Sequence, residues 1–134
     1  MQDGPARCNR LAITRPSPRS RHAIDHLVDP PREPVHARVA ERDGRLVGLV
    51  HFLYHRSTTL VGPTCYLQDL FTLDSERGKG VGRALIEAVY DAARQQRAER
   101  VYWQTHETNH TAMRLYDTVA EKTGFAIHRK VLPR

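Results

Sequence analysis

The 134-residue sequence predicts a single α/β (α+β) domain, in which helices flank a mixed, mostly antiparallel sheet. Three observations lead to this prediction. Two alternating apolar segments flank an Asp-Gly pair, and a third apolar segment runs into a glycine-rich turn. After that turn the apolar period changes from two residues to about 3.6. Strand pairs followed by strand–helix–strand units indicate a sheet with both antiparallel and parallel neighbours.

The first 33 residues differ from the rest of the chain. They contain five prolines and six arginines, and most of this stretch shows neither a helical nor a strand period. We therefore predict residues 1–33 to be an irregular Pro/Arg-rich segment, with at most one short helical turn at residues 23–28. The folded domain is expected to comprise residues 34–134.

A hairpin is predicted to open the sheet. Residues 35–41 alternate apolar and polar side chains, and Asp43-Gly44 suits a two-residue turn. Residues 46–54, rich in Val, Leu, Phe and Tyr, form the returning strand. A third strand is expected at residues 66–73.

The second half of the chain reads as two helices, each followed by a strand. The first helix is expected from Val81 to Gln95 or Gln96, because one face carries its apolar residues, which are Val81, Ala84, Leu85, Ala88, Val89 and Ala92. A strand at residues 100–105 follows. Asn109 is predicted to cap a second helix, which Gly124 ends. A last strand is expected at residues 125–132.

Three alternating glycines, Gly78, Gly80 and Gly82, lie between the third strand and the long helix. Glycine lets the backbone approach a ligand closely, and a helix N-terminus offers unpaired amides and a positive dipole end. The positively charged side chains in this segment are Arg77, Lys79 and Arg83. The spacing fits neither a Walker A loop nor a G-x-G-x-x-G fingerprint. The pattern favours an anion site, and a tight turn without a ligand is the alternative.

The segment Arg77-x-x-Gly80-x-Gly82 resembles motif A of the GNAT superfamily of acetyl-CoA-dependent acetyltransferases. The likeness extends over about residues 35–132. It continues in the family's order through Ala84-Leu85-Ile86, Val101-Tyr102-Trp103-Gln104-Thr105, Asn109-x-x-Ala112-x-x-Leu115-Tyr116 and Thr123-Gly124-Phe125. The pattern around Trp103 and Asn109 looks most like the branch that includes histone and polyamine acetyltransferases.

The resemblance implies an N-acetyltransferase that uses acetyl-CoA as co-substrate. It would transfer the acetyl group directly, in a ternary complex, to a primary amine such as a small amine, a polyamine or a protein lysine. The alternative is a CoA-binding module of the same fold with little or no catalytic activity. The resemblance also implies a homodimer.

The resemblance further implies roles for individual residues. Backbone amides from Gly78 to Arg83 would hold the CoA pyrophosphate, and the main chain around Phe71 and Thr72 would pair with the pantetheine arm. Tyr116 would act as general acid on the leaving thiolate. The complete set of residues expected at the cofactor is Phe71, Thr72, Arg77, Gly78, Lys79, Gly80, Val81, Gly82, Arg83 and Asn109.

The general base is left open by the sequence. A free alkylamine has a pKa near ~10.4, so it must lose a proton before it can attack a thioester. Asp69, on the third predicted strand, is the leading candidate, either directly or through water, and His106 and Glu107 compete with it. By family analogy, the backbone amide near Phe71 is expected to donate to the oxyanion.

The cysteine and histidine residues suggest neither a thiol nucleophile nor a metal site. Cys65 is expected to pack as a small apolar residue rather than act as a nucleophile. No metal site is expected, because His51 and His55 lack a convincing third ligand.

The front of the chain departs from the family pattern. The family begins with a strand and two helices that wall the acceptor site, and residues 1–33 do not show that pattern. This strand–helix–helix part is therefore expected to be missing or atypical.

Composition and net charge limit the classes of partner that we expect this chain to bind. The net charge of +6 allows a nucleic-acid role, but no aromatic stacking platform or groove-reading motif accompanies it, so nucleic acid is not the expected partner. No apolar run approaches the ~18 residues of a membrane span, so no membrane association is expected. Two cysteines make no disulfide framework, and the expected location is the reducing cytoplasm.

Overall fold

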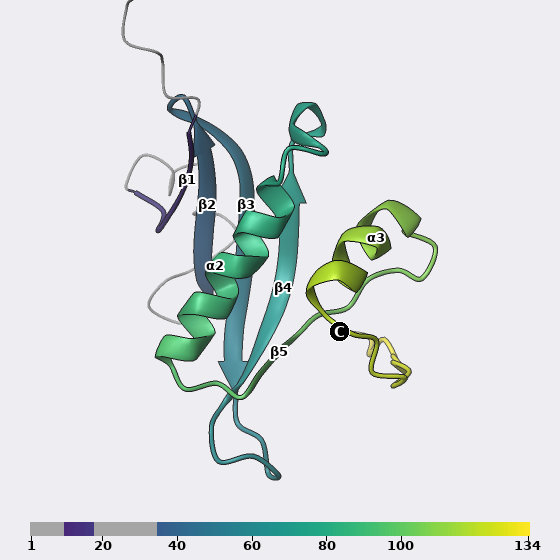
Figure 1. Ribbon diagram of the computed structural model, residues 1–134. Coiled ribbons are helices and arrows are strands. Elements are labelled where there is room, and N and C mark those ends of the chain that lie inside the picture. The colour runs from purple at the N-terminus through teal and green to yellow at the C-terminus, as the bar shows by residue number, and fades with distance from the viewer. Residues whose placement is uncertain (1–9, 18–34) are drawn as a thin grey trace, which may run out of the picture. The chain divides into compact units, whose positions relative to one another are not determined.

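The computed structural model describes residues 10–17 and 35–134 and arranges their strands in one five-stranded sheet of order β1-β2-β3-β4-β5 (Figure 1). The strands are β1 (Leu11–Thr14), β2 (His36–Arg42), β3 (Arg45–His55), β4 (Thr64–Thr72) and β5 (Arg100–Tyr102). β1 to β4 are antiparallel neighbours, and β5 runs parallel to β4. The prediction of a mixed, mostly antiparallel sheet is therefore confirmed.

The chain divides into two compact units, Met1–Gln104 and Thr105–Arg134. The first contains the sheet, the short 3₁₀ helix η1 (Asp74–Glu76) and the helix α2 (Val81–Gln95). The second contains the helix α3 (His110–Val119).

The β2–β3 hairpin forms where the sequence predicts it. Its two turn residues, Asp43 and Gly44, have φ angles of +53° and +76°, the left-handed values that a tight two-residue hairpin turn requires. Glycine adopts this conformation without strain, and aspartate tolerates it better than most residues do. The turn chemistry explains why local sequence alone was sufficient to predict this element.

α2 lies across one face of the sheet (Figure 1). It packs against β3 at Gly48, where an added Cβ would lie 2.9 Å from Val81 Cγ1 and 2.9 Å from the carbonyl oxygen of Phe71. Glycine is therefore required there for close packing of helix against sheet. Because side chains alternate along a strand, residues one and three positions after Gly48 face away from α2.

The core lies between this helix and the sheet. Its largest fully buried side chains include Phe52, Leu85, Ile86, Val39 and Val50. On α2 the buried residues are Val81, Leu85, Ile86, Val89, Ala92 and Ala93. The helix bounds match the prediction, but the apolar face is rotated from the expected one, since Ala84 and Ala88 are only half-buried.

The prediction that residues 1–33 are irregular is wrong for β1. Residues Leu11–Thr14 form a strand that pairs with β2, from Leu11 opposite Arg42 to Thr14 opposite Val39. The edge of the β2–β3 hairpin supplies the hydrogen-bonding partner, a long-range effect that local composition does not reveal. The expected absence of a front strand is thus corrected, and the helical turn considered at residues 23–28 lies outside the described residues.

The second unit departs from the prediction at its end. The strand expected at residues 125–132 does not form, and Phe125, Ile127, Val131 and Leu132 are exposed. A strand needs a neighbour for its backbone groups, and no strand of the described residues pairs with this segment. α3 ends at Val119, before Gly124, and β5 ends at Tyr102 rather than Thr105.

Candidate acetyl-CoA site

The junction between β4 and α2 is held by a short series of backbone hydrogen bonds. Leu73 N–H donates to the Val47 carbonyl at 3.0 Å, which anchors the end of β4 to β3. Arg77 N–H donates to the backbone carbonyl of Asp74 at 3.2 Å, and Lys79 N–H donates to the backbone carbonyl of Glu76 at 3.2 Å. These bonds form two successive turns, and the chain enters α2 directly after them.

Two glycines of this loop adopt conformations that other residues rarely take. Gly78 and Gly80 have φ angles of +75° and +82°, and nothing lies within 4 Å of a Cβ added at either one. Gly80 is the N-cap of α2, and intrahelical bonding starts with Ala84 N–H donating to the Gly80 carbonyl at 3.0 Å. The first amides of the helix, including those of Val81 and Gly82, therefore have no intrahelical acceptor. An anion can approach this backbone closely, as the sequence predicts.

A buried ion pair lies beneath the loop. Glu76, the last residue of η1, accepts a hydrogen bond from Arg42 Nε at 3.1 Å, and the two side chains are only 10% and 16% exposed. Because Arg42 ends β2, this pair ties the loop to the sheet's first hairpin. Its cation also offsets a buried carboxylate next to a site that would bind an anion.

In the part of the chain that the structure describes, one edge of β4 has no strand partner past the end of its short ladder with β5. The parallel ladder joins only Thr64, Cys65 and Tyr66 of β4 to β5. Among the described residues, no strand covers the same edge of β4 from Leu67 to Thr72. The main chain at Phe71 and Thr72, predicted to pair with a pantetheine arm, thus belongs to a strand edge that is open on that side.

Asp69 lies on β4 between the loop and the ladder to β5. Its register partner is His51 of β3, and His51 Nδ1 lies 3.2 Å from Asp69 Oδ2. The side chain of Asp69 is 59% exposed. Since His51 is three positions after Gly48, the pair faces away from α2. A carboxylate in this position can accept a proton from a ligand on that face.

The other two predicted site residues lie on α3 in the second unit. Asn109 is the N-cap of α3, and its Oδ1 accepts a hydrogen bond from Ala112 N–H at 3.3 Å, as predicted. Tyr116 lies in the last turns of the helix, and burial raises the pKa of its phenol. The predicted site residues of the first unit thus lie together on β4, the glycine loop and the start of α2. Asn109 and Tyr116 lie together on α3.

The sequence model of the Acetyltransferase (GNAT) family matches residues 6–120, which is most of the chain. The chain belongs to the GNAT family. The left-handed glycines and the start of α2 lie within the matched residues. The match also covers β1, in agreement with the strand that the structure places at the front of the sheet.

Curated relatives share part of the chain. It is 39% identical over 87 residues to the D-amino-acid N-acetyltransferase HPA3 of Saccharomyces cerevisiae, covering 65% of this chain and 54% of that protein. It is 33% identical over 89 residues to the uncharacterized N-acetyltransferase YhfO of Bacillus subtilis, covering 65% and 60%. The chain thus spans between half and two thirds of the length of these relatives.

Solved structures confirm the GNAT fold. An aminoglycoside acetyltransferase, HMB0005, from an uncultured soil metagenomic sample superposes with a TM-score of 0.79 at 16% identity, covering 93% of this chain and 99% of that one. A ribosomal-protein-alanine N-acetyltransferase from Brucella melitensis biovar Abortus 2308 superposes with a TM-score of 0.76 at 18% identity, covering 92% and 99%. Within the described part of the chain, no helix has the length and apolarity to cross a membrane.

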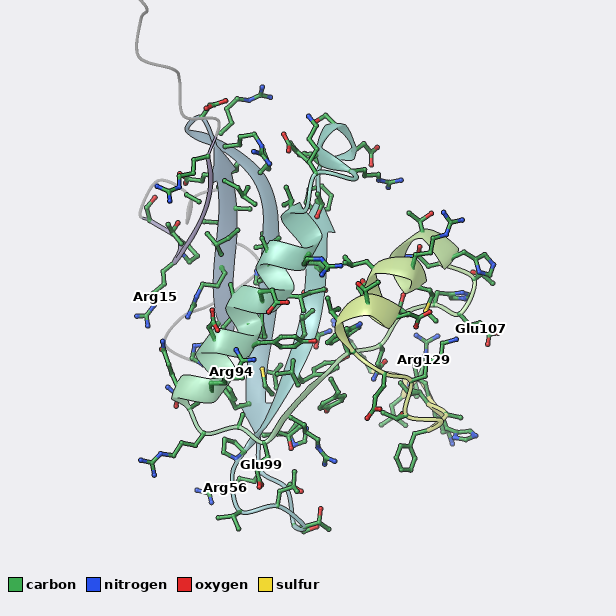
Figure 2. The ribbon with its side chains drawn as sticks, viewed as in Figure 1. Arg15, Arg56, Arg94, Glu99, Glu107 and Arg129 are labelled. Atoms are coloured by element: carbon green, nitrogen blue, oxygen red, sulfur yellow. The ribbon has the colours of Figure 1, made fainter. Side chains whose placement is uncertain are left out.

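The competing base candidates of this GNAT chain lie on the loop that leads into α3. His106 Nδ1 accepts a hydrogen bond from Thr108 N–H at 3.3 Å and lies 2.6 Å from Thr108 Oγ1, so that nitrogen is engaged within its own loop. Glu107 lies on the same loop, and its side chain points outward from it (Figure 2). Asp69 differs from both because it lies on a sheet strand, held by a neighbouring strand.

Cys65 is fully buried on β4, and burial raises the pKa of its thiol to about 11. A thiol with such a pKa carries almost no thiolate near neutral pH, so it is no nucleophile. The expectation that Cys65 packs as an apolar residue is confirmed. No group of three or more His, Cys, Asp or Glu residues that could hold a metal ion occurs among the described residues.

Two features of the site were missed by sequence reasoning. His51 was considered only as a metal ligand, and neither Arg42 nor Glu76 was singled out. Each pair joins residues far apart in sequence, 18 positions for His51 and Asp69 and 34 for Arg42 and Glu76. A signal for His51 existed, since a histidine inside an apolar strand needs a polar neighbour.

Proposed function

We propose that this GNAT chain is an acetyl-CoA-dependent N-acetyltransferase that transfers the acetyl group directly to a primary amine. One observation carries the proposal. A strand with an open edge leads into a loop whose two left-handed glycines, Gly78 and Gly80, expose the first amides of α2. This arrangement suits a ligand with a pyrophosphate next to an extended amide-containing arm, as in acetyl-CoA.

In the proposed complex, backbone amides between Gly78 and Arg83 hold the pyrophosphate, apart from that of Lys79, which donates to the Glu76 carbonyl, and the Arg77 and Lys79 side chains add positive charge. The side chain of Arg77 is 69% exposed and pairs with Asp74 Oδ1 at 3.0 Å, so it can turn toward a phosphate at little cost. The pantetheine arm runs along the open edge of β4 at Phe71 and Thr72. This supports acetyl-CoA as co-substrate, since both halves of the molecule find complementary backbone groups.

Asp69 is the proposed general base for the acceptor amine. The amine arrives as a cation, so a carboxylate attracts it and then accepts its proton. On the same face of β4 as Asp69 lie Tyr66 and Phe71, and Phe71 is 54% exposed. Aromatic faces attract a cationic head and cover its apolar part. The acceptor therefore combines an amine with apolar carbon.

Tyr116 is the proposed general acid for the departing CoA thiolate. Burial raises the pKa of its phenol, so the hydroxyl keeps its proton through the neutral range and has one to give. The family resemblance of Leu115-Tyr116 supports this role. The homodimer that the branch resemblance implies belongs to the same proposal, and light scattering tests it.

The acceptor class is best approached from the relatives. The yeast relative is named for acetylation of D-amino acids, so D-phenylalanine and D-methionine come first. Spermidine and a lysine-containing peptide complete the panel, because the proposed face recognises an amine with apolar carbon rather than one scaffold.

Calorimetric titration of acetyl-CoA into wild type, Gly80→Glu and Gly44→Glu tests the proposal. Gly80 and Gly44 both have positive φ and open surroundings, so the two variants introduce the same charge and similar strain. We expect Gly80→Glu to abolish binding and Gly44→Glu to retain it. Equal binding by all three proteins would contradict the loop assignment.

Release of the CoA thiol, measured with each amine of the panel, then distinguishes an active acetyltransferase from a CoA-binding module without catalysis. Turnover with any acceptor supports the proposal. Acetyl-CoA binding without turnover on any amine would instead favour a CoA-binding module of the same fold.

A further inference from the structure

We propose that His51 is a positioning residue for the general base, and that it orients the carboxylate of Asp69 toward the acceptor amine by donating a hydrogen bond from Nδ1. This inference rests on the proposed function, in which Asp69 accepts the proton of that amine. It adds a residue on a different strand, which contacts Asp69 and not the reacting atoms.

The two side chains differ in exposure in the way this role requires. His51 is only 6% exposed, whereas Asp69 is 59% exposed, and His51 Nδ1 lies 3.2 Å from Asp69 Oδ2. The imidazole is thus buried, whereas the carboxylate reaches solvent. One oxygen is engaged by the ring, and Oδ1 remains for the amine.

A β-bulge lies next to this pair. His51 pairs with Asp69, but the next residue, Phe52, pairs with Leu67, so Gln68 is an additional residue on β4. A bulge bends its strand and redirects the neighbouring side chains. The direction of the Asp69 side chain therefore depends on its contact across the strands as well as on the regular pleat.

The chemistry of the pair fixes the tautomer of His51. An ionised carboxylate only accepts hydrogen bonds, so Nδ1 must carry the hydrogen. In the neutral ring Nε2 then holds a lone pair, and this buried atom has no hydrogen-bond partner among the residues that the structure describes. A buried polar atom without a partner lowers stability, and such costs often mark functional positions.

The proton step proceeds without a change in His51. The ammonium N–H bond of the acceptor breaks, its proton forms an O–H bond with Oδ1 of Asp69, and the neutral amine keeps the electron pair for attack on the thioester. His51 keeps Nδ1–H throughout. Its contribution is orientation, which determines how well the carboxylate meets the amine.

Steady-state kinetics of four His51 and Asp69 variants tests the inference, with D-phenylalanine, spermidine and a lysine peptide as acceptors. His51→Leu removes the donor while keeping an apolar side chain of similar bulk. We expect kcat to fall by about tenfold or more, within the range that acid–base catalysis supplies, with the KM for acetyl-CoA within about twofold. His51→Asn restores a donor near the position of Nδ1, and we expect it to recover most of kcat.

A double-mutant cycle separates positioning from a structural role. If His51 acts through Asp69, His51→Leu in the Asp69→Asn background lowers kcat by less than about twofold further. We also expect the Tm of His51→Leu to equal or exceed that of wild type, because the buried Nε2 is gone. Additive losses, or a Tm that falls in parallel with kcat, would overturn the inference.

The remaining outcomes distinguish this inference from the proposed function. A wild type without turnover on any amine removes the proposed activity and the positioning role together. An active wild type whose Asp69→Asn variant keeps full kcat leaves the acetyltransferase activity in place and refutes both Asp69 as the general base and the role of His51. A ¹⁵N spectrum of the histidine rings gives an independent readout, since the inference requires Nδ1 of His51 to be the protonated nitrogen.

Discussion

Gly48 lies against both β4 and α2, the two elements of the proposed acetyl-CoA site. Gly48→Ala should therefore lower both the stability of the protein and its affinity for acetyl-CoA. The new methyl group would lie 2.9 Å from the Phe71 carbonyl oxygen on β4, 2.9 Å from Val81 Cγ1 at the start of α2 and 3.1 Å from Leu85 Cδ1. A backbone oxygen cannot be displaced without moving its strand, and a β-branched valine has few rotamers to escape into.

The expected magnitude follows from two opposing effects. Overpacking a core costs about 1–3 kcal/mol, and the more restricted unfolded chain of the alanine variant returns about 0.4–1 kcal/mol. The net loss of about 1–2 kcal/mol lowers the Tm by about 3–10 °C for a chain of this size. A shifted Val81 also misplaces the first amides of α2, for which we expect about tenfold weaker acetyl-CoA binding, or about 1.4 kcal/mol.

Differential scanning calorimetry and acetyl-CoA titration measure the two effects of Gly48→Ala. Gly44→Ala is the matched control, because its φ of +76° makes alanine strained there while nothing lies within 4 Å of the new Cβ. The control should lose stability and keep its affinity for acetyl-CoA. A Gly48→Ala protein with wild-type affinity, or with an unchanged Tm, would refute the idea that Gly48 sets the spacing between β4 and α2.

Further predictions concern the buried pair, the general acid and the free thiol. Glu76→Ala leaves Arg42 largely buried without its carboxylate, so the Tm should fall by several degrees and acetyl-CoA should bind more weakly, while an unchanged melting curve would show that the pair is unimportant. Tyr116→Phe should lower kcat and leave the acetyl-CoA Kd unchanged, and unchanged turnover would exclude Tyr116 as the acid. Burial raises the pKa of Cys65 from 9.0 to about 11, so the stability it contributes is fully present below pH 9 and is lost as the pH rises through 11. Mass spectrometry should find Cys65 unreacted with iodoacetamide at pH 8 in the folded protein and alkylated in urea, whereas alkylation of the folded protein would contradict its burial.

The elements that sequence reasoning placed well are those specified by local chemistry. Asp43-Gly44 dictates a tight turn, and the 3.6-residue period of α2 is long enough to be unambiguous. The glycine loop is also local, since Gly78 and Gly80 lie within one turn of the helix they precede. The turn and α2 form as predicted, and the glycine loop has a conformation that suits the predicted anion site, because neighbours in sequence supply the determining interactions.

The predictions that were wrong or missing concern segments whose structure depends on residues far away in the sequence. Leu11–Thr14 is too short to signal a strand, and it forms one by pairing with β2. Residues 125–132 alternate like a strand, but no described strand pairs with them. His51 could not be assigned to Asp69, because a regular ladder continued from the Phe52–Leu67 pair would place Gln68 opposite it.

Asn109 shows how a structural role and a proposed cofactor contact can be separated. Its Oδ1 caps α3 at 3.3 Å from Ala112 N, and the residues of this ten-residue helix are at most half-buried. Loss of the cap costs about 1 kcal/mol, a large share of what stabilises so short a helix. Asn109→Ala would therefore lower the helix content of α3 even without any cofactor contact.

Asn109→Ser is the informative change, because serine keeps a capping oxygen and lacks the side-chain amide. If the amide contacts acetyl-CoA, calorimetry should show weaker binding in Asn109→Ser while circular dichroism shows unchanged helix content. Wild-type affinity in Asn109→Ser, together with reduced helix content in Asn109→Ala, would assign Asn109 to the helix cap alone. The proposed cofactor site would then be confined to β4, the glycine loop and the start of α2.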